Sequence, residues 1–334
     1  MHTELCQADD ASIRRAAALL RAGELVAFPT ETVYGLGADA LNGEAAARIF
    51  AAKGRPADNP LIAHIAGESG LAGLIAGEPC ACARKLMRAF WPGPMTLIFP
   101  KSPRVPREVT AGLDTVAVRM PSHPVARALI RAAQTPIAAP SANRSGRPSP
   151  TTAAHVLEDM EGRIPLILDG GPCEVGLEST VVDVTGARPR ILRPGGVTLE
   201  MLEGVVGDVD VDEGVLHQLQ AGSQARSPGM KYKHYAPKGE VTIVTGPRAA
   251  QEIARLYDAA DGRAAILAFS QADYGARRVY RLKNAPGELF AALRQLDEDG
   301  METIYAEDVP TTGVGLAVMN RLMRAAAFRV VEAQ

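Results

Sequence analysis

Short apolar runs alternate with amphipathic stretches of helical period along the first 200 residues of the chain. The apolar runs predict strands at 24–28, 61–65, 95–99, 115–120, 136–139, 164–168, 179–184 and 190–193. The stretches with one apolar face predict helices at 10–21, 42–52, 68–76, 80–90 and 124–133, and a further helix that opens at Thr151 or Thr152. This alternation of strands and helices places the chain in the α/β class.

The last third of the chain repeats the alternation on a smaller scale. It predicts strands at 241–244, 264–269 and 278–282, and helices that begin near 248, 287 and 314. We interpret this part as a small Rossmann-like α/β domain, in which we find no catalytic cluster. The stretch 221–239 before it contains no acid and indicates a basic linker. Because 334 residues exceed what one core usually serves, we expect a domain at 1–205, a linker at 206–238 and a domain at 239–334.

Residues 28–65 hold an unusual concentration of polar chemistry. The sequence PTETVYGLG at 29–37 predicts a hydroxyl-rich turn, whose two glycines would let the backbone approach a ligand closely. Lys53 and Arg55 flank a predicted helix end, and His64 interrupts an apolar strand. Each feature has a structural alternative, because cations stabilise helix C-termini, interior histidines are often only hydrogen-bonded, and threonines form turns. The ligand-binding interpretation therefore depends on a second polar cluster.

The second polar cluster is the loop 140–150, PSANRSGRPSP, which joins a predicted strand to a predicted helix. A polar loop at a helix N-terminus is a common anion site in α/β folds. A surface loop with a helix N-cap has the same composition, so the loop alone leaves both interpretations open. The occurrence of both clusters in one domain favours a site for an anionic ligand.

Composition narrows the function classes. Hydrophobic residues make up 47% of the chain and charged residues 22%, which is typical of globular proteins. A net charge of -2 argues against a protein that coats nucleic acid. We find no apolar N-terminal leader and no long apolar run, and we therefore expect a cytoplasmic protein without a membrane span. The four cysteines lack metal-ligand spacing, so we expect reduced thiols and no metal held by the protein alone.

Neither polar cluster matches a common nucleotide-binding motif, since the sequence lacks G-x-x-x-x-G-K-[ST] and G-x-G-x-x-G. The sequence PTETVYGLG, the KGR of 53–55 followed by the NPL of 59–61, and the SAN of 141–143 closely resemble the L-threonylcarbamoyladenylate synthase family. In that family, Lys-x-Arg and Ser-x-Asn are the signature of the YrdC-like domain. The SPGM of 227–230 and the HYAP of 234–237 are similar to the linker motif of its long, two-domain form.

The resemblance implies a fold and a reaction. The fold is a YrdC-like twisted mixed sheet with flanking helices, followed by a smaller Rossmann-like domain. The reaction joins L-threonine, bicarbonate and ATP to give L-threonylcarbamoyl-AMP and pyrophosphate, the first step toward the t6A modification of tRNA. Mg²⁺ would accompany ATP, no organic cofactor is expected, and the product would pass to the tRNA threonylcarbamoyl-transfer machinery. The oligomeric state, the role of the C-terminal domain and direct tRNA binding stay open.

The resemblance also assigns roles to residues of this chain. Lys53 and Arg55 are the implied catalytic cations, a point charge and a planar fork for anionic oxygens. The implied L-threonine contacts are Thr32, His64, Arg119 and Ser179, with Arg119 as the natural partner of the carboxylate. The implied ATP contacts are Arg55, Asn59, Thr115, Ala139, Ser141, Asn143, Ser149, Arg193 and Tyr235. Among these, Tyr235 would be a lid over ATP.

Two other classes of protein are alternatives to a synthase of this family. A non-catalytic RNA-binding module would need more than the 4% of aromatic residues present, and a long basic stripe that the sequence lacks. A carbamoyl transferase of the hydrogenase-maturation type also uses a YrdC-like domain. That class carries acylphosphatase-like and zinc-finger modules, which we do not find in this sequence.

Overall fold

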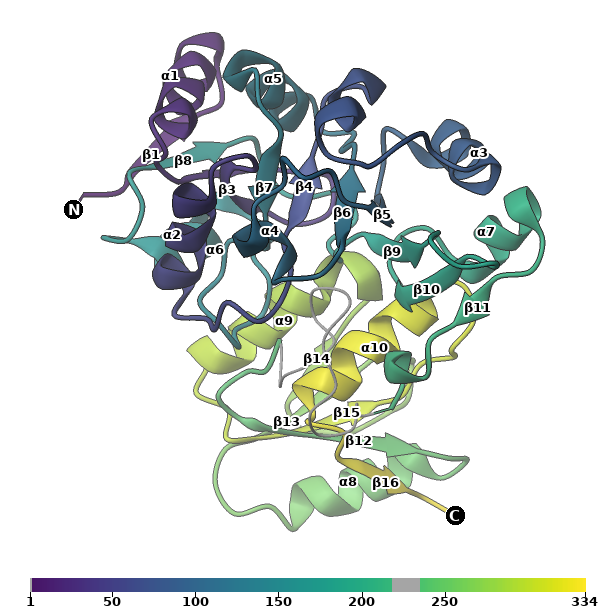
Figure 1. Cartoon of the computed structure of the whole chain (residues 1–334). Helices are drawn as coiled ribbons and strands as arrows, with labels where there is room; N and C mark the ends of the chain where they lie inside the picture. Colours follow the sequence, from purple (N-terminus) through teal and green to yellow (C-terminus); the bar gives the residue numbers. More distant parts are fainter. Residues whose placement is uncertain (1, 218–234) are drawn as a thin grey trace.

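Two sheets organise the structure, a computed structural model that describes residues 2–217 and 235–334. A mixed sheet of 11 strands belongs to the N-terminal part, and a parallel sheet of 5 strands belongs to the C-terminal part. Figure 1 shows helices α9 (Ala285–Glu298) and α10 (Gly315–Ala325) between the two sheets. The predicted α/β class is confirmed.

The large sheet places strands from distant parts of the sequence next to one another. Strand β4 runs parallel to β6 and antiparallel to β7, so that His64 lies opposite both Arg119 and Ile137. The spatial order is β1 (Glu4–Gln7), β8 (Leu166–Asp169), β2 (Val26–Phe28), β3 (Gly35–Asp39), β7 (Ile137–Ala139), β4 (Ile62–His64), β6 (Thr115–Arg119), β5 (Met95–Pro100), β9 (Thr180–Asp183), β10 (Arg190–Arg193) and β11 (Asp210–Val211).

The helices of this part begin and end where local capping permits. Asp9 and Ser12 form a capping box at the start of α1, and Asn42 accepts a hydrogen bond from the Ala45 amide at the start of α2. Gly54 ends α2 in the left-handed conformation. The elements are α1 (Asp10–Arg21), α2 (Gly43–Lys53), α3 (Ala81–Phe90), α4 (Arg107–Thr110), α5 (Pro124–Ala133), α6 (Ala153–Met160) and α7 (Leu199–Val206), with 3-10 turns η1 (Glu68–Gly73) and η2 (Glu213–Val215).

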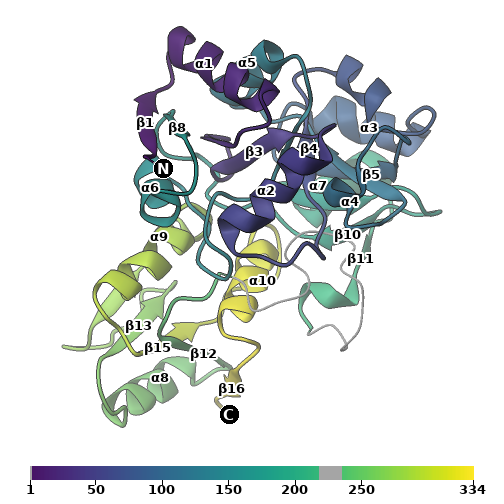
Figure 2. The same cartoon turned by 60° about the vertical axis from the view of Figure 1, so that its left-hand side comes forward.

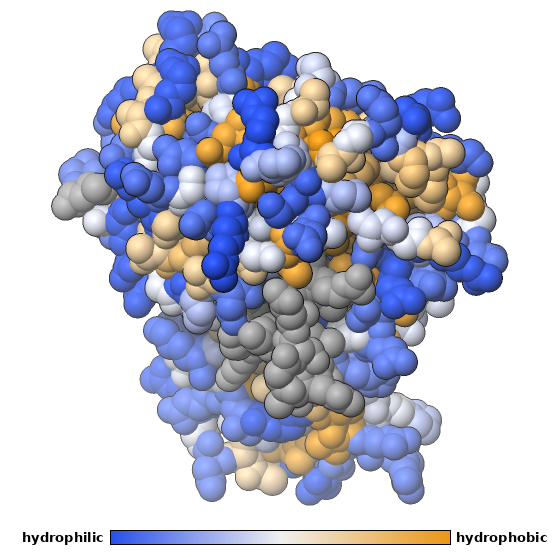
Figure 3. Space-filling view, viewed as in Figure 1, coloured by the Kyte–Doolittle hydropathy of each residue, from blue (hydrophilic) through white to orange (hydrophobic). Residues whose placement is uncertain are grey.

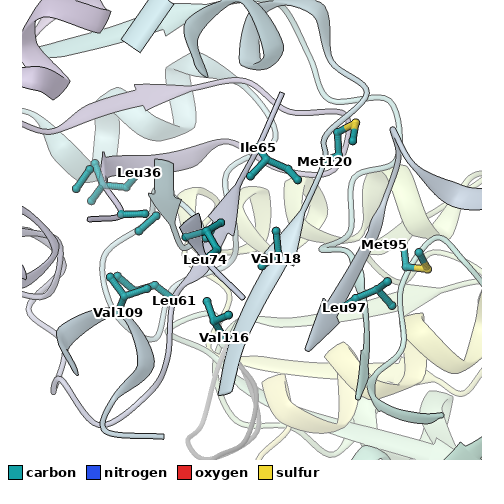
Figure 4. Packing of buried hydrophobic residues seen from close by; sticks show 14 of the residues in the cluster. Leu36, Leu61, Ile65, Leu74, Met95, Leu97, Val109, Val116, Val118 and Met120 are labelled. Carbon is teal, nitrogen blue, oxygen red and sulfur yellow. The ribbon is translucent and has the colours of Figure 1, made fainter. Parts of the chain in front are cut away.

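Alternation along the strands separates two faces of the large sheet. One face packs against α2, α3, α4, α6 and α7 in the main core, to which Leu97 and Val118 belong (Figure 4). On the other face, α1 and α5 cover β2, β7 and β8. Ile62 and Ala117 lie on that second face and belong to a small apolar cluster. Two positions further along the same strands, on the same face, are His64 and Arg119. The site residues thus lie on the same face as α1 and α5, over the strands that these two helices do not cover.

The smaller sheet has the order β14 (Val279–Arg281), β13 (Ala264–Ala268), β15 (Thr303–Glu307), β12 (Glu240–Thr245) and β16 (Val330–Glu332). All four neighbouring pairs are parallel, which requires crossover connections such as α8 (Ala249–Asp258) between β12 and β13. Helix α8 packs on β12, β13 and β15, while α9 and α10 occupy the side toward the large sheet (Figure 2). This is the Rossmann-like arrangement that the sequence predicts.

The two parts share a buried apolar core. Val33 and Leu177 of the N-terminal part belong to the same cluster as Leu289 and Phe290 of α9 and Leu322 of α10. Leu177 is completely buried in this cluster. The contact between the domains therefore resembles a domain core more than a flexible junction.

Several elements differ from the prediction. Residues 35–37, expected within the turn 29–37, belong to strand β3 (Gly35–Asp39). Gly37 packs there so closely that a side chain would collide with Ile137 and Phe28. The predicted helix 68–76 is only the 3-10 turn η1. Strand β11 and the 3-10 turn η2 lie inside the range predicted as linker, 206–238. Strands β1, β15 and β16 and the short helices α4 and α7 were not predicted.

Hydrophilic residues cover most of the face of the molecule seen in Figure 3. Within the described ranges 2–217 and 235–334, none of the helices is both long and apolar enough to cross a membrane.

Candidate functional site

A cavity opens on the uncovered face of the large sheet, where the strands that carry both polar clusters meet. Its walls come from the segment after β2, from the strands β4, β6 and β7, from the residues around β9 and β10, and from Tyr235. The lining residues are Thr30, Thr32, Val33, Gly35, Arg55, Ile62, His64, Arg119, Ala139, Pro140, Ser141, Glu178, Ser179, Arg193 and Tyr235.

One end of the cavity is organised by a buried ion pair. Arg119 at the end of β6 donates to Glu31 Oε1 over 2.6 Å and to Thr32 Oγ1 over 2.9 Å. Burial raises the pKa of the Glu31 carboxyl, but the charge and hydrogen bond of Arg119 outweigh it and hold that pKa below its usual value. Arg119 Nε is buried and has no hydrogen-bond partner among residues 2–217 and 235–334. The guanidinium therefore keeps one donor for a ligand after pairing with Glu31.

His64 forms the wall beside this pair. Its Nδ1 lies 3.0 Å from the carbonyl oxygen of Ile62, and its ring meets the edge of Phe28 at 6.1 Å between centroids. Burial, and then the charge of Arg119, lowers the pKa of His64 to about 3. The imidazole is therefore neutral near pH 7, and it offers one nitrogen donor or acceptor without adding a second cation next to Arg119.

Lys53 joins the two polar clusters. Its Nζ donates to the carbonyl oxygens of Ser141 and Asn143 over 2.5 and 2.6 Å, and the Ser145 amide donates back to the Lys53 carbonyl. The side chain of Lys53 is buried, and burial followed by the charge of Arg55 lowers its pKa well below the usual value. Lys53 thus fixes the loop 140–150 against the end of α2, while Arg55 lines the cavity.

Ser179 and Arg193 form a further wall of the cavity. Ser179 Oγ lies 2.7 Å from Thr96 Oγ1 of β5, and Arg193 donates from Nε and Nη2 to the Ser179 carbonyl over 3.1 and 3.0 Å. Burial lowers the pKa of Arg193 to about 10, so this guanidinium still carries its charge near neutral pH. A second fixed cation therefore lines the same cavity as Arg55.

Glu178 lines the cavity next to Ser179 and receives donors from both domains. Ser149 Oγ donates to Glu178 Oε1 over 2.5 Å, and Arg321 of α10 donates to Glu178 Oε2 over 2.9 Å. Burial raises the pKa of the Glu178 carboxyl, but Arg321, Arg193 and Ser149 together hold that pKa below its usual value. The acid is therefore ionised and fully engaged within the protein.

Tyr235 closes the cavity from the side of the C-terminal domain. Its ring packs on Phe290 with 5.2 Å between centroids, and the Arg321 guanidinium lies 5.9 Å from the ring centre. The next residue, Ala236, donates its amide to the Gly146 carbonyl of the loop 140–150 over 3.0 Å. Tyr235 thus lies where the second polar cluster and the C-terminal domain meet.

Comparison with known proteins adds the family. The family model described as "Telomere recombination" matches residues 18–195, and the model described as "Threonylcarbamoyl-AMP synthase, C-terminal domain" matches residues 197–327. A threonylcarbamoyl-AMP synthase of Bacillus subtilis is 50% identical over 340 residues, which cover 98% of this chain and 97% of that protein. The chain belongs to the threonylcarbamoyl-AMP synthase family.

Other members of the family agree over the same extent. The threonylcarbamoyl-AMP synthase of Pyrococcus abyssi is 49% identical over 96% of this chain and 95% of its own length. The crystal structure of P. abyssi Sua5 complexed with L-threonine has a TM-score of 0.92 at 47% identity, and covers 100% of this chain and 99% of that one. The H234A/Y235A variant of the same protein has a TM-score of 0.93 at 46% identity.

The structure brings most of the sequence-predicted site residues of this synthase family member to one cavity. The predicted residues that line it are Thr32, Arg55, His64, Arg119, Ala139, Ser141, Ser179, Arg193 and Tyr235. Lys53 and Asn143 lie behind the lining, where they hold the loop 140–150. Ser149 is buried and bonds Glu178. Asn59 is buried outside the lining, and Thr115 lies at the start of β6 opposite Pro100.

Sequence reasoning missed three charged residues that organise the cavity. Glu31 lies inside the sequence 29–37 that was predicted as a turn. A carboxylate between two threonines was the sequence feature that could have indicated its role. Glu178 directly precedes Ser179 at the start of a predicted strand. Arg321 comes from the domain in which no catalytic cluster was found, and no local pattern on α10 distinguishes it from the neighbouring arginines.

Most of the basic linker lies outside the described residues. The linker motif SPGM and the positions before Tyr235 fall in residues 218–234, so the predicted lid is represented by Tyr235 alone.

Proposed function

We propose that this chain is a threonylcarbamoyl-AMP synthase that condenses L-threonine, bicarbonate and ATP into L-threonylcarbamoyl-AMP and pyrophosphate. The observation that carries the proposal is one cavity lined both by Arg119 with the hydroxyls of Thr32 and Ser179, which we call the polar end, and by Arg55 and Arg193, which we call the cationic end. Family membership and the threonine complex of P. abyssi Sua5 support the same assignment.

The polar end suits an amino acid of threonine size. The Nε donor of Arg119 has no partner in the part of the chain that the structure describes and can bind a carboxylate. Thr32 and Ser179 offer hydroxyls, and His64 offers a neutral ring nitrogen, for the amine and the side-chain hydroxyl. Glu31 fixes Arg119 in place over 2.6 Å, which limits the volume that a substrate can occupy.

The cationic end suits a triphosphate. Arg55 and Arg193 provide planar forks that match phosphate oxygens, and the loop held by Lys53 presents Ser141. An anion bound here would also favour the charged form of Lys53, whose pKa burial lowers. We assign the ATP phosphates to this end.

The chemistry follows from this placement. The threonine amine attacks the carbon of bicarbonate, and loss of one oxygen as water, which takes up the amine proton, gives a carbamate. A carbamate oxygen then attacks the α-phosphorus of ATP, and the bond to the bridging oxygen breaks as pyrophosphate leaves. Holding the three reactants together and neutralising phosphate charge supplies the acceleration, so the protein needs no nucleophile of its own. Closure by Tyr235 would keep water from the hydrolysable product.

Magnesium would enter with the nucleotide. Both acids near the cavity are committed, Glu31 to Arg119 and Glu178 to Ser149 and Arg321. In the described part of the chain, no group of three or more His, Cys, Asp or Glu residues is arranged to hold a metal. A Mg²⁺ ion that enters with the triphosphate takes most of its ligands from phosphate and water. It therefore needs few carboxylates from the protein.

The proposed product is an activated intermediate and not an end product. A mixed carbamic–phosphoric anhydride transfers its carbamoyl group readily, so we propose that it passes in the cytoplasm to enzymes that modify tRNA.

The test is pyrophosphate release by the full chain with ATP and Mg²⁺. Release should require both L-threonine and bicarbonate, and L-serine or L-valine should support it less well because each lacks one group that the polar end recognises. A chain that releases no pyrophosphate with all substrates present would refute the proposed function.

A further inference from the structure

A chain of hydrogen bonds links two hydroxyl groups at the polar end of the cavity. Thr30 Oγ1 donates to the Val33 carbonyl over 2.6 Å, and the hydroxyl oxygens of Thr30 and Thr32 are 2.8 Å apart. Arg119 Nη1 donates to Thr32 Oγ1 over 2.9 Å. Both threonines line the cavity and are almost completely buried. The family resemblance assigns a role to Thr32 but none to Thr30.

The chemistry of the partners fixes the direction of each bond. A carbonyl oxygen can only accept, so the hydrogen of the Thr30 hydroxyl points to Val33. An arginine nitrogen can only donate, so Arg119 supplies the hydrogen of its bond to Thr32. The contact of 2.8 Å between the two hydroxyls also needs a hydrogen, and only Thr32 has one left to give. Thr32 therefore donates to Thr30.

The hydroxyl of Thr32 is consequently an acceptor toward the cavity. Its hydrogen is engaged with Thr30 and one of its lone pairs with Arg119, so one lone pair is left. Within the ranges 2–217 and 235–334, no other donor bonds to this oxygen. The remaining lone pair can bind an N–H or O–H group of a ligand, and it repels a group that can only accept.

Neighbouring bonds hold this arrangement in place. Thr30 Oγ1 also receives the amides of Thr32 and Val33 over 3.2 and 3.3 Å, as in a turn closed by a threonine side chain. Glu31 holds the Arg119 guanidinium over 2.6 Å. The Thr32 hydroxyl therefore cannot turn its hydrogen toward the cavity without breaking its bond to Thr30.

We propose that Thr30 is a positioning residue that makes Thr32 a fixed hydrogen-bond acceptor for L-threonine. Thr30 acts through Thr32, and the pair selects a ligand that offers a donor there, either the amine or the side-chain hydroxyl of L-threonine. The inference rests on the proposed function and adds a specificity-determining residue to it.

The first test compares Thr30→Val with Thr30→Ser in the full chain. Valine has nearly the shape of threonine but no hydroxyl, so the Thr32 hydrogen loses its acceptor and can turn toward the cavity. We expect Thr30→Val to weaken the binding of L-threonine at least about tenfold. Thr30→Ser keeps the hydroxyl and should restore the affinity to within about threefold of the wild-type value.

Thr3 supplies a matched control. Its buried hydroxyl donates to the Ile164 carbonyl over 2.6 Å and accepts from the Gly162 amide over 2.9 Å, but Thr3 does not line the cavity. Thr3→Val should lower the melting temperature and leave the affinity for L-threonine within about twofold.

Two analogues identify the group that Thr32 binds, in equilibrium competition with labelled L-threonine. O-methyl-L-threonine lacks the hydroxyl hydrogen, and (R)-3-hydroxybutyrate lacks the amine. The wild type should prefer L-threonine to both, because a site built for a donor rejects an analogue without it. In Thr30→Val, the preference over one analogue should shrink at least about fivefold, because Thr32 no longer presents a fixed acceptor.

The shrinking preference assigns the bound group, the hydroxyl for O-methyl-L-threonine and the amine for (R)-3-hydroxybutyrate. Each preference is a ratio measured within one variant, so a change in stability alone leaves it unaltered. Thr32→Val removes the acceptor but keeps the bond of Thr30 to Val33, and should shrink the same ratio. Ratios that stay at the wild-type values in Thr30→Val or in Thr32→Val would overturn the inference.

The binding assay needs no turnover, which separates this inference from the proposed function. A wild-type protein that binds L-threonine with the expected preferences but releases no pyrophosphate would refute the function alone. An active wild type whose preferences survive in Thr30→Val would refute the role of Thr30 alone.

Discussion

At the scale of single residues, the two cations of the Lys-x-Arg motif have different surroundings. Arg55 lines the cavity, whereas Lys53 is buried behind it with its Nζ bonded to two backbone carbonyls. A single resemblance to the family assigned both residues the same catalytic role. The structure supports a direct ligand contact for Arg55 and a loop-holding role for Lys53.

This difference predicts that Arg55→Ala lowers mainly the activity, whereas Lys53→Ala lowers the stability as well. Arg55→Ala should lower kcat/KM by about 10- to 100-fold, because a lost charge-assisted hydrogen bond costs about 1.5 to 3 kcal/mol of ligand binding. Lys53→Ala should in addition lower the free energy of unfolding by about 2 to 3 kcal/mol, because the carbonyls of Ser141 and Asn143 lose their donor. Urea unfolding and pyrophosphate kinetics on both variants check this.

The contrast has its own control. Lys85 is a lysine of the outer helix α3, far from the cavity lining, so Lys85→Ala should change neither quantity beyond about 0.5 kcal/mol. An unchanged unfolding free energy for Lys53→Ala would contradict the loop-holding role.

The pair Glu31–Arg119 predicts a pH dependence. In the wild type the folded-state pKa of Glu31 lies below its usual value, so its contribution to stability is present above the unfolded pKa and is lost as pH falls through the folded pKa. In Arg119→Leu, Glu31 loses the charge and the hydrogen bond that hold its pKa down, while burial, the largest influence on it, remains and raises its folded pKa. The variant therefore gains relative stability as pH falls.

The stability difference between wild type and Arg119→Leu should therefore be largest near pH 7 and should narrow toward pH 4. Chemical unfolding at a series of pH values measures it. In the double variant Arg119→Leu/Glu31→Gln, position 31 no longer carries a carboxylate. The stability difference from the wild type that is due to an unpaired Glu31 should then lose its pH dependence. A difference that is constant with pH would contradict the proposed burial of an unpaired carboxylate.

At the scale of elements, glycines explain why β3 was not predicted. The sequence GLGAD of β3 contains two glycines and few β-forming residues, and such a run usually indicates a turn. In the sheet, Gly37 faces Phe28 of β2 and Ile137 of β7 with no space for a side chain. The glycines therefore permit close packing between strands, a tertiary requirement that the local sequence does not show.

A pair of glycine substitutions checks this explanation. Gly37→Ala should destabilise the protein by about 1 to 3 kcal/mol, because its Cβ would lie 2.8 Å from Ile137 Cγ2 and 2.9 Å from Phe28 Cε1. Gly204→Ala, in helix α7 with nothing within 4 Å of the added Cβ, should stabilise by about 0.5 to 1 kcal/mol. Thermal unfolding of both variants gives the two signs, and a neutral Gly37→Ala would show that β3 can move apart from its neighbours.

Elements with local signals were predicted well, and elements without them were missed. Helix α5 was predicted with its observed bounds because Pro124 opens it and an apolar face continues to Ala133. Strand β16 has no bounding turn signals and β11 has only two residues, whereas β15 was missed although Gly300 precedes it and Pro310 follows it. The motif residues predicted the cavity. The roles of Glu31 and Glu178 were not predicted, because their pairing with Arg119 and Arg321 depends on strand register and on packing between the domains.

At the scale of the whole molecule, the two domains share buried charges as well as a core. Arg294 of α9 bonds Asp159 of α6 over 2.6 Å, and Arg321 of α10 bonds Glu178. Both arginines are almost completely buried, so separating the domains would expose ion pairs and apolar surface together. The second domain is therefore part of the structural framework of the site, and we expect the two domains to unfold together.

The shared core supplies the last prediction. Leu177 belongs to the N-terminal part by sequence but packs in the apolar cluster of α9 and α10, so Leu177→Ala removes contacts from both domains at once. We expect a loss of about 2 to 5 kcal/mol, as for other buried leucines. Differential scanning calorimetry should show one transition in the wild type and one transition, shifted to lower temperature, in the variant. Leu202→Ala, in the core of the large sheet alone, is the matched control and should shift the same single transition. Two separate transitions in the wild type, of which Leu177→Ala moves only one, would show that the domains unfold independently.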